Sequence, residues 1–349
     1  MKTIIHQMFV KTLSKYKKWT PIKHSVIKDD AMANEIHTKG YVVIPFLNGE
    51  QLQAAKVLYE QEHSFDIKNG GMFYSLYSKD ISYRKRVHET LNNLFNPILQ
   101  EHFKNYKNIV NTFITKASGP DSEFYVHQDT TALDEFKHSP LSIWIPLQDI
   151  TPDNGALGVI EKTHWFFSPY RGISFKSPFQ AINSNLKSYL KPIYLKAGEA
   201  IVFDPRIVHN SMPNTSGNDR IVALCGVFPK EAEFITCFKE PENGRKIELI
   251  KHNDTYILEN KSFFYDCHSR PKTGNTIQEV EDDFPEMNIE TFETLCELND
   301  IPKLNIIENK ERGHCEFIAE PNGINLDSTH VVTIKNTKSV WDKIKTVFK

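Results

Sequence analysis

The sequence predicts a mainly β protein with flanking helices, whose core is a double-stranded β-helix, the cupin-like form of the jelly roll. From about residue 109 onwards, short apolar runs alternate with turn residues. The turn Asp153-Asn-Gly155 lies between two of these runs and is a strong signal for a tight hairpin. Many short strands separated by turns are typical of sandwiches and barrels, and among these we expect a jelly roll.

Each expected element follows from its own pattern. The run 40–45 is β-branched and bounded by glycine and proline, which predicts a strand. Apolar residues at helical spacing predict helices over 49–63 and 83–103, and Pro97 is expected to kink or divide the second. Further strands are expected at 109–115, 124–126, 141–147, 156–160, 193–195, 200–203 and 221–228. Further helices are expected near 289–298 and 340–348.

The chain of 349 residues divides into three expected parts. Residues 1–33 form a basic arm or helix, with seven lysines and no acidic residue up to Lys28. Residues 34–235 form the jelly-roll core. Residues 236–349 form a C-terminal extension that we expect to act as a lid, a homodimer contact or a partner surface.

Composition narrows the class of protein. A hydrophobic content of 40% with 25% charged residues is typical of a globular chain with a full core. The net charge of −2 gives no basic field for nucleic acid or an anionic membrane. No stretch approaches the roughly 20 apolar residues that span a bilayer. Five cysteines without a CxxC pair are typical of reduced thiols, so we expect a soluble cytoplasmic protein.

One triplet has the spacing of a metal site. His127-Gln-Asp129 ends a predicted strand, where residues two apart project to the same face. His209 is the expected third ligand, because it follows another predicted strand in a loop bracketed by Pro205 and Pro213. Two imidazoles and one carboxylate on one face of Fe(II) leave three coordination positions open for a co-substrate and O₂.

A second triplet, His252-Asn-Asp254, shows how weak the motif is alone. A chain with 14 histidines is expected to contain about one such triplet by chance. Arg220 distinguishes the first, because it opens a predicted strand after His209 and its guanidinium can grip a dicarboxylate with two hydrogen bonds. No comparable strand follows the second triplet, which we interpret as a solvated turn.

Taken together, these residues resemble the phytanoyl-CoA dioxygenase family of 2-oxoglutarate-dependent oxygenases. The resemblance covers about residues 34–235. The matching segments are Phe113-Ile-Thr-Lys116, His127-Gln-Asp129, Leu141-Ser-Ile-Trp-Ile-Pro146, Asp153-Asn-Gly-Ala-Leu157, Lys162-Thr-His164, Gly198-Glu-Ala-Ile-Val-Phe-Asp204, and His209-Asn-Ser211 with Arg220.

The resemblance implies a role for each matching residue. The ligands of Fe(II) would be His127, Asp129 and His209. The residues that would bind 2-oxoglutarate are Arg220, which would hold the distal carboxylate, Ser211, Lys116 and Trp144.

Three of these residues have plain structural alternatives. Lys116 is equally well interpreted as a solvated strand residue, and Trp144 as a core residue in an alternating strand. Ser211 could satisfy a hydrogen bond within its own loop. The sequence leaves these alternatives open.

The resemblance also implies the reaction, which is hydroxylation of an unactivated C–H bond with release of succinate and CO₂. Related halogenases have a small residue in place of the carboxylate, so Asp129 favours hydroxylation, with desaturation or cyclisation open. The expected partners are O₂ and a small biosynthetic molecule, amino-acid-like by preference. Candidate substrate contacts are Tyr74, Tyr77, Arg84 and Arg171.

Other functions remain open at this point. A peptide or carrier-bound substrate would suit the same chemistry. A non-catalytic jelly-roll protein could keep the pocket for recognition only, and a metal enzyme of the same fold could work without 2-oxoglutarate. Loss of activity on replacing Arg220 would separate the last class from the oxygenases.

Overall fold

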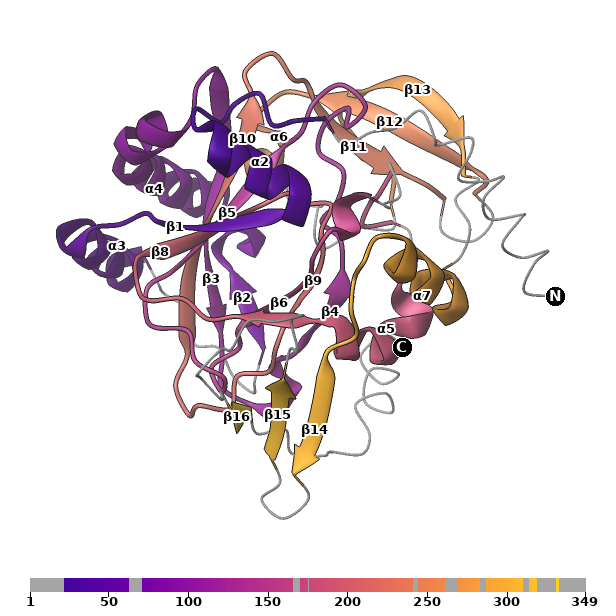
Figure 1. Cartoon of the computed structure of the whole chain (residues 1–349). Helices are drawn as coiled ribbons and strands as arrows, with labels where there is room; N and C mark the ends of the chain where they lie inside the picture. The colour runs from indigo at the N-terminus through magenta and orange to yellow at the C-terminus, as the bar shows by residue number, and fades with distance from the viewer. Residues whose placement is uncertain are drawn as a thin grey trace.

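The structure is a computed structural model that describes residues 22–62, 71–165, 170–174, 176–240, 244–260, 269–282, 287–309, 314–318 and 331–332 (Figure 1). Two antiparallel sheets form its centre. The larger sheet has the order β1-β8-β5-β10-β3-β2 and the smaller one the order β4-β9-β6-β7. Most neighbouring strands in both sheets, such as β1 and β8 or β4 and β9, are far apart in the chain, as in a double-stranded β-helix. The predicted jelly roll is therefore confirmed.

The strands of the larger sheet are β1 (Tyr41–Pro45), β8 (Glu199–Phe203), β5 (Leu141–Pro146), β10 (Arg220–Pro229), β3 (Tyr106–Lys116) and β2 (Met72–Tyr74). Those of the smaller sheet are β4 (Phe124–His127), β9 (Val208–Ser211), β6 (Leu157–Ile160) and β7 (Lys191–Ile193). The helices are α2 (Asp30–Lys39), α3 (Gly49–Glu62), α4 (Ile81–His102), α5 (Asn183–Leu186), α6 (Tyr256–Glu259) and α7 (Ile289–Leu298). The remaining strands are β11 (Phe234–Phe238), β12 (Lys246–His252), β13 (Asn275–Glu281), β14 (Asn305–Asn309), β15 (His314–Ile318) and β16 (Val331–Val332).

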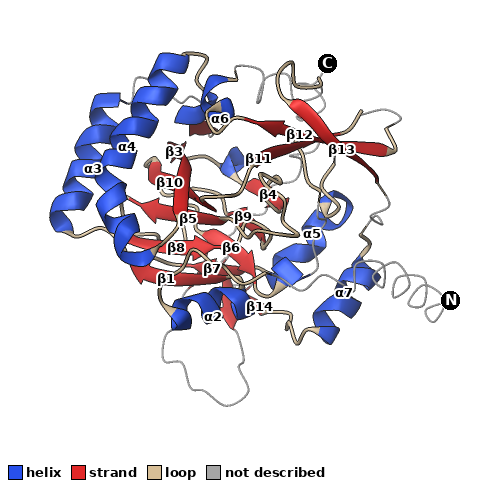
Figure 2. Cartoon of the chain, turned by 90° about the horizontal axis from the view of Figure 1, so that it is seen from above, coloured by secondary structure: helices blue, strands red, loops and turns tan. Residues whose placement is uncertain are grey.

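Alternation along the strands builds a core on each face of the larger sheet. In β5, Ile143 and Ile145 point to one face and pack with residues of α2, α3 and α4. Trp144 points to the other face and packs with side chains from the smaller sheet. Successive residues of a strand project to opposite faces, so one strand contributes to both cores. Figure 2 shows α3 and α4 lying side by side against the larger sheet.

A third sheet belongs to the C-terminal extension. It consists of β11, β12 and β13 in antiparallel order and lies to one side of the jelly roll (Figures 1 and 2). Phe234 and Tyr256 join a buried cluster with Ile109, Leu133 and Phe228 of the core. The backbone N–H of Ile235 also donates to the carbonyl of Ala132 at 3.1 Å. The sheet is thus attached to the jelly roll by an apolar joint.

Most predicted elements are present, with two corrections. The structure contains the expected strands, although β7 lies two residues before the predicted 193–195, and the helices corresponding to 49–63, 83–103 and 289–298, whereas 340–348 lies outside the described residues. Pro97 lies inside α4 without dividing it. The turn Asp153-Asn-Gly155 does not join paired strands, because β5 and β6 belong to different sheets. The chain crosses between the sheets there.

The strands of the extension and the strands β2 and β9 were not predicted. Of the expected N-terminal arm, residues 1–21 lie outside the described part of the chain, and α2 begins at Asp30. Within the described residues, no helix is both long enough and apolar enough to cross a membrane.

Candidate active site

The three predicted metal ligands meet where β4 and β9 run side by side. His127 and His209 are register partners across these strands, and their ring centroids are 4.2 Å apart. The Oδ1 atom of Asp129 lies 3.7 Å from Nε2 of His127 and 3.8 Å from Nε2 of His209. One ligand atom from each residue falls within 4.8 Å of the other two. This spacing suits a single ion bound to all three.

Hydrogen bonds at the far side of both rings set their orientation. Nδ1 of His127 lies 2.8 Å from the carbonyl oxygen of Tyr125, and Nδ1 of His209 lies 2.9 Å from that of Ile207. A carbonyl only accepts, so Nδ1 carries the proton in each ring and the lone pair of Nε2 faces the ligand cluster. Such carbonyl partners are the usual way of fixing the tautomer of a metal-binding histidine.

The protonation states also fit a divalent cation. Burial and the neighbouring His127 lower the pKa of His209 to about 4, so that imidazole is neutral near pH 7. Burial acts to raise the pKa of Asp129, but His127, His209 and Arg171 outweigh it and hold that pKa below its usual value. A metal binds the deprotonated form of each ligand. Two neutral imidazoles and a carboxylate form the facial donor set of a non-haem Fe(II) site.

Arg220 forms the cofactor end of the site. It opens β10, is 1% exposed, and donates from Nη1 to the carbonyl of Gly155 at 2.8 Å and to Oγ of Ser211 at 3.4 Å. Its guanidinium carbon lies 5.0 Å from the centre of the Trp144 ring. Its buried Nε has no hydrogen-bond partner among the described residues. A buried cation with an unused donor fits a carboxylate ligand such as the distal end of 2-oxoglutarate.

Lys116 lies beside Arg220 in the register of β3 and β10 and is fully buried. Its amine donates to the carbonyls of Ser122, Ser211 and Met212 at 2.6, 3.0 and 2.7 Å. Burial, followed by repulsion from Arg220, lowers its pKa to about 6. Each of the three carbonyls can accept one hydrogen of the ammonium form, so these hydrogen bonds favour the charged form and oppose the effect of burial on the pKa. The alternative of a solvated strand residue is wrong, and contact with 2-oxoglutarate stays a prediction.

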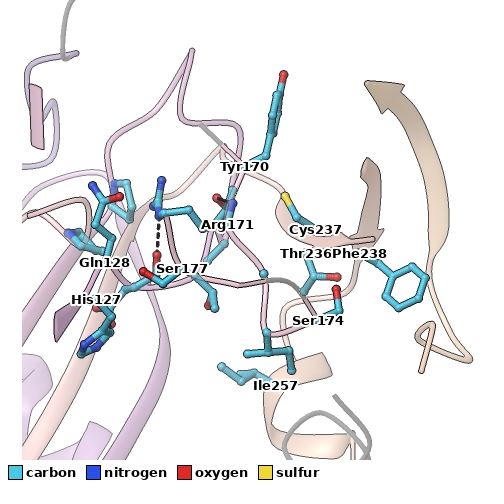
Figure 3. A pocket seen from close by; sticks show the side chains of 18 of the residues that line it. His127, Gln128, Tyr170, Arg171, Ser174, Ser177, Thr236, Cys237, Phe238 and Ile257 are labelled. Carbon is cyan, nitrogen blue, oxygen red and sulfur yellow. Dashed lines mark hydrogen bonds and ion pairs between the residues drawn. The ribbon is translucent and has the colours of Figure 1, made fainter. Parts of the chain in front are cut away.

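A cavity of about 1040 Å³ reaches the metal ligands from the side of the C-terminal sheet. Figure 3 shows it extending from His127 and Gln128, past Arg171, to Thr236 and Ser174. The cofactor residues Lys116, Trp144, Ser211 and Arg220 are not among its lining residues, whereas Asp129 is. The cavity thus borders two of the three metal ligands, His127 and Asp129.

Comparison with known proteins decides the family. A family model described as "Phytanoyl-CoA dioxygenase (PhyH)" matches residues 36–222, more than half of the chain. The chain belongs to the phytanoyl-CoA dioxygenase family. The resemblance inferred from the sequence is confirmed. A member with the complete ligand set is a 2-oxoglutarate-dependent non-haem iron oxygenase, and its cofactors are Fe(II) and 2-oxoglutarate.

Relatives and solved structures are more distant. The phytanoyl-CoA dioxygenase domain-containing protein 1 homolog of Dictyostelium discoideum is 26% identical over 231 residues, 62% of this chain and 73% of the relative. HygX from Streptomyces hygroscopicus, solved with nickel, 2-oxoglutarate and hygromycin B, is 14% identical with a TM-score of 0.43, covering 58% of this chain and 88% of its own. The epimerase SnoN, solved with Fe³⁺, alpha-ketoglutarate and nogalamycin RO, is 17% identical with a TM-score of 0.41, covering 59% and 85%. Such distant likenesses do not bear on the substrate of this chain.

The predicted substrate contacts fall into two groups. Tyr74 and Tyr77 line the cavity and stack on each other with ring centroids 4.4 Å apart. Arg171 also lines it. Arg84 is not among the lining residues: it is buried in α4 and donates to the carbonyls of Ser78 and Asn260. Arg84 thus joins α4 to two other segments through buried hydrogen bonds. This position does not support a contact between Arg84 and the substrate.

Several residues of the site were not found from the sequence. Phe124 and Tyr125 flank the metal face, and Tyr125 is 57% exposed although it is large and aromatic. Tyr125 lies two residues before His127 on the same strand and therefore projects to the same face, so this spacing could have identified it from the sequence. The cavity wall formed by the extension, which includes Thr236, Phe238 and Lys239, had no signal because its strands were not predicted.

The comparison triplet is not the solvated turn that we expected. His252 ends β12, is 7% exposed, and shares a hydrogen bond of 2.8 Å with Thr236. Its ring stacks on Tyr256 with centroids 3.6 Å apart. Asp254 is at the surface, where it pairs with Lys107. The two residues point to different environments, so this triplet is structural.

Proposed function

We propose that the protein hydroxylates an unactivated C–H bond of a small organic molecule in the cavity, with 2-oxoglutarate and O₂ as co-substrates. In this reaction 2-oxoglutarate, O₂ and R–H give succinate, CO₂ and R–OH. One oxygen atom of O₂ enters succinate and the other enters the product. The bound iron would supply the O₂ activation that no side chain can perform.

The observation that carries the proposal is that the ligand cluster lies beside both Arg220 and the cavity. His209 is on the same strand as Ser211, whose Oγ accepts from Arg220, and no described residue accepts a hydrogen bond from the buried Nε of Arg220. The cavity reaches His127 and Asp129 directly. A site that binds co-substrate and substrate at one ion can orient both before reaction.

The chain's own residues supply binding and orientation. Arg220 would hold the distal carboxylate of 2-oxoglutarate with a charge-assisted bond, and the face of Trp144 would confine its guanidinium. The aromatic pair of Tyr74 and Tyr77 would pack against the substrate near the metal. Because Asp129 fills the third protein position, no place for a halide ligand is left, and hydroxylation is favoured over halogenation.

The size of the cavity favours a substrate larger than a free amino acid. Pockets for drug-sized ligands have volumes of about 300–1,000 Å³, and this cavity, at about 1040 Å³, slightly exceeds that range. Residues of the extension line the cavity, among them Thr236, Phe238 and Lys239, and we propose that these lining residues select the substrate and cover it. A peptide or carrier-bound substrate would enter through the same opening. A homodimer contact through the extension stays a prediction.

Anaerobic reconstitution tests the proposal. Addition of Fe(II) and 2-oxoglutarate should produce the weak visible charge-transfer band of the chelate, and candidate substrates should shift it. With O₂, succinate should form in step with hydroxylated product. His127→Ala should abolish both the band and turnover, whereas Arg86→Gln, which removes a surface ion pair between Arg86 of α4 and Glu62 of α3, should change neither. A normal band in His127→Ala would refute the assigned ligand set.

A further inference from the structure

The metal ligand Asp129 lies outside the sheet, just beyond the end of β4, so no strand partner holds its backbone. Two other contacts take over this task. Its N–H donates to the carbonyl of Pro205 at 2.9 Å, in the turn that leads to β9 and His209. Its carbonyl accepts a hydrogen bond from Nε of Arg171 at 2.6 Å. The orientation of this ligand therefore depends on one side chain from a different segment.

Arg171 is itself fixed by a buried carboxylate. Its two terminal nitrogens donate to the two oxygens of Glu135 at 2.9 and 2.6 Å, and the side chains are 6% and 1% exposed. Thr131 binds the backbone of Arg171 twice, through its own N–H and through its hydroxyl, both at 2.9 Å. At least three of the five N–H donors of this guanidinium are thus engaged within the protein.

The segment that carries Arg171 is also part of the cavity wall. Tyr170, Gly172, Ile173 and Ser174 all line the cavity. Oγ of Ser174 accepts a hydrogen bond from the backbone N–H of Lys239, at the end of β11. Figure 3 shows Arg171 between His127 on one side and Ser174 with Thr236 on the other. One short segment thus connects the extension to the metal ligand.

We propose that Arg171 is a positioning residue: it orients Asp129 through the backbone carbonyl and couples metal binding to the order of the wall segment 170–174. Coupling between two sites is reciprocal. Metal binding must stabilise the segment to the same extent that the ordered segment strengthens metal binding. The inference depends on the metal ligands and not on the identity of the substrate.

Hydrogen exchange of the unaltered protein tests the coupling without 2-oxoglutarate or substrate. Mn(II) serves as a redox-stable substitute for Fe(II), and exchange is followed by mass spectrometry with and without the ion. Peptides covering 127–135 and 170–174 should both become protected, whereas peptides covering α3 should not change. Unchanged exchange over 170–174, with protection over 127–135, would overturn the coupling.

Substitutions test the positioning role. Loss of a side chain that orients a metal ligand typically weakens metal binding about 10–100-fold. We expect that loss for Mn(II) in Arg171→Gln, measured by calorimetry, and no change in Arg86→Gln, which removes an Arg–Glu pair at the surface between α3 and α4. Arg171→Lys should also lose affinity, because an ammonium cannot bridge Glu135 and the carbonyl with the geometry of a planar fork.

Far-UV circular dichroism and the melting temperature without metal identify any variant that fails to fold, and affinity is compared only for folded variants. Glu135→Gln provides a milder change, because its amide oxygen still accepts one hydrogen bond, and it should fall between the native protein and Arg171→Gln. Native-like Mn(II) affinity in folded Arg171→Gln or Arg171→Lys would overturn the positioning role. Absence of turnover with every substrate tested would refute the proposed hydroxylation and leave these measurements unaffected.

Discussion

Gly155 offers a sharp test of how the cofactor end is built. Its φ is +84°, and a Cβ atom there would lie 2.7 Å from Cδ of Lys116 and 3.0 Å from the carbonyl oxygen of Met212. The left-handed conformation costs a residue with a side chain about 1–2 kcal/mol. Overlap in a packed interior adds about 1–3 kcal/mol. Gly155→Ala should therefore lower the free energy of unfolding by about 2–5 kcal/mol.

Gly217 provides the matched control. Its φ is +85°, but a Cβ atom there would meet nothing within 4 Å. Gly217→Ala should lower the free energy of unfolding only by the cost of the left-handed conformation, about 1–2 kcal/mol. Urea unfolding followed by circular dichroism measures both variants. Because the carbonyl of Gly155 accepts from Arg220, 2-oxoglutarate affinity should also fall about tenfold, or 1.4 kcal/mol, in Gly155→Ala alone. Equal stability and equal 2-oxoglutarate affinity in the two variants would refute the close-packing argument.

Two further predictions concern charge. Arg220→Lys should weaken 2-oxoglutarate binding about 10–100-fold, since hydrogen bonds to charged groups contribute about 1.5–3 kcal/mol. The Mn(II) affinity measured by calorimetry should stay unchanged. A parallel loss of Mn(II) affinity would contradict the assignment of Arg220 to the co-substrate and not to the metal. Burial lowers the pKa of both His209 and His164 from 6.5 to about 4. Between pH 4 and 6.5 the unfolded chain therefore binds more protons than the folded protein. The free energy of unfolding of the metal-free protein should accordingly rise as the pH is raised through this range. His164→Gln should reduce the rise of the urea unfolding midpoint between pH 4 and pH 7. An unchanged dependence of the midpoint on pH would show that His164 does not contribute to it.

The metal face could be predicted from sequence because its geometry is local. His127 and Asp129 are two residues apart at the end of one strand, and strand alternation places them together without knowledge of the rest of the fold. His209 could be added because the carboxylate and imidazole required a third donor, although its strand, β9, was interpreted as a loop between two prolines. Four residues with prolines on either side leave too little pattern to separate a strand from a turn.

The substrate side could not be predicted in the same way. The roles of Arg84 and Arg171 depend on acceptors far away in the chain: Asn260 and Glu135 respectively. A buried arginine with protein acceptors and an exposed one that meets a ligand look the same in a sequence. The wall strand β11 also lacks alternation: every one of its residues is buried, so no period of two marks it as a strand.

The residues that would bind the ion and the keto acid all belong to 116–220, whereas part of the cavity wall comes from later residues, among them Phe234, residues 236–239 and Tyr256. This later part follows the first stretch in the chain, although the wall residues 170–174 lie within that first stretch. A lineage could therefore change the later stretch and acquire new substrates, while the residues that would bind the ion and the keto acid were inherited unchanged. Recombining this wall with the barrel of another member is accordingly a practical route to altered selectivity.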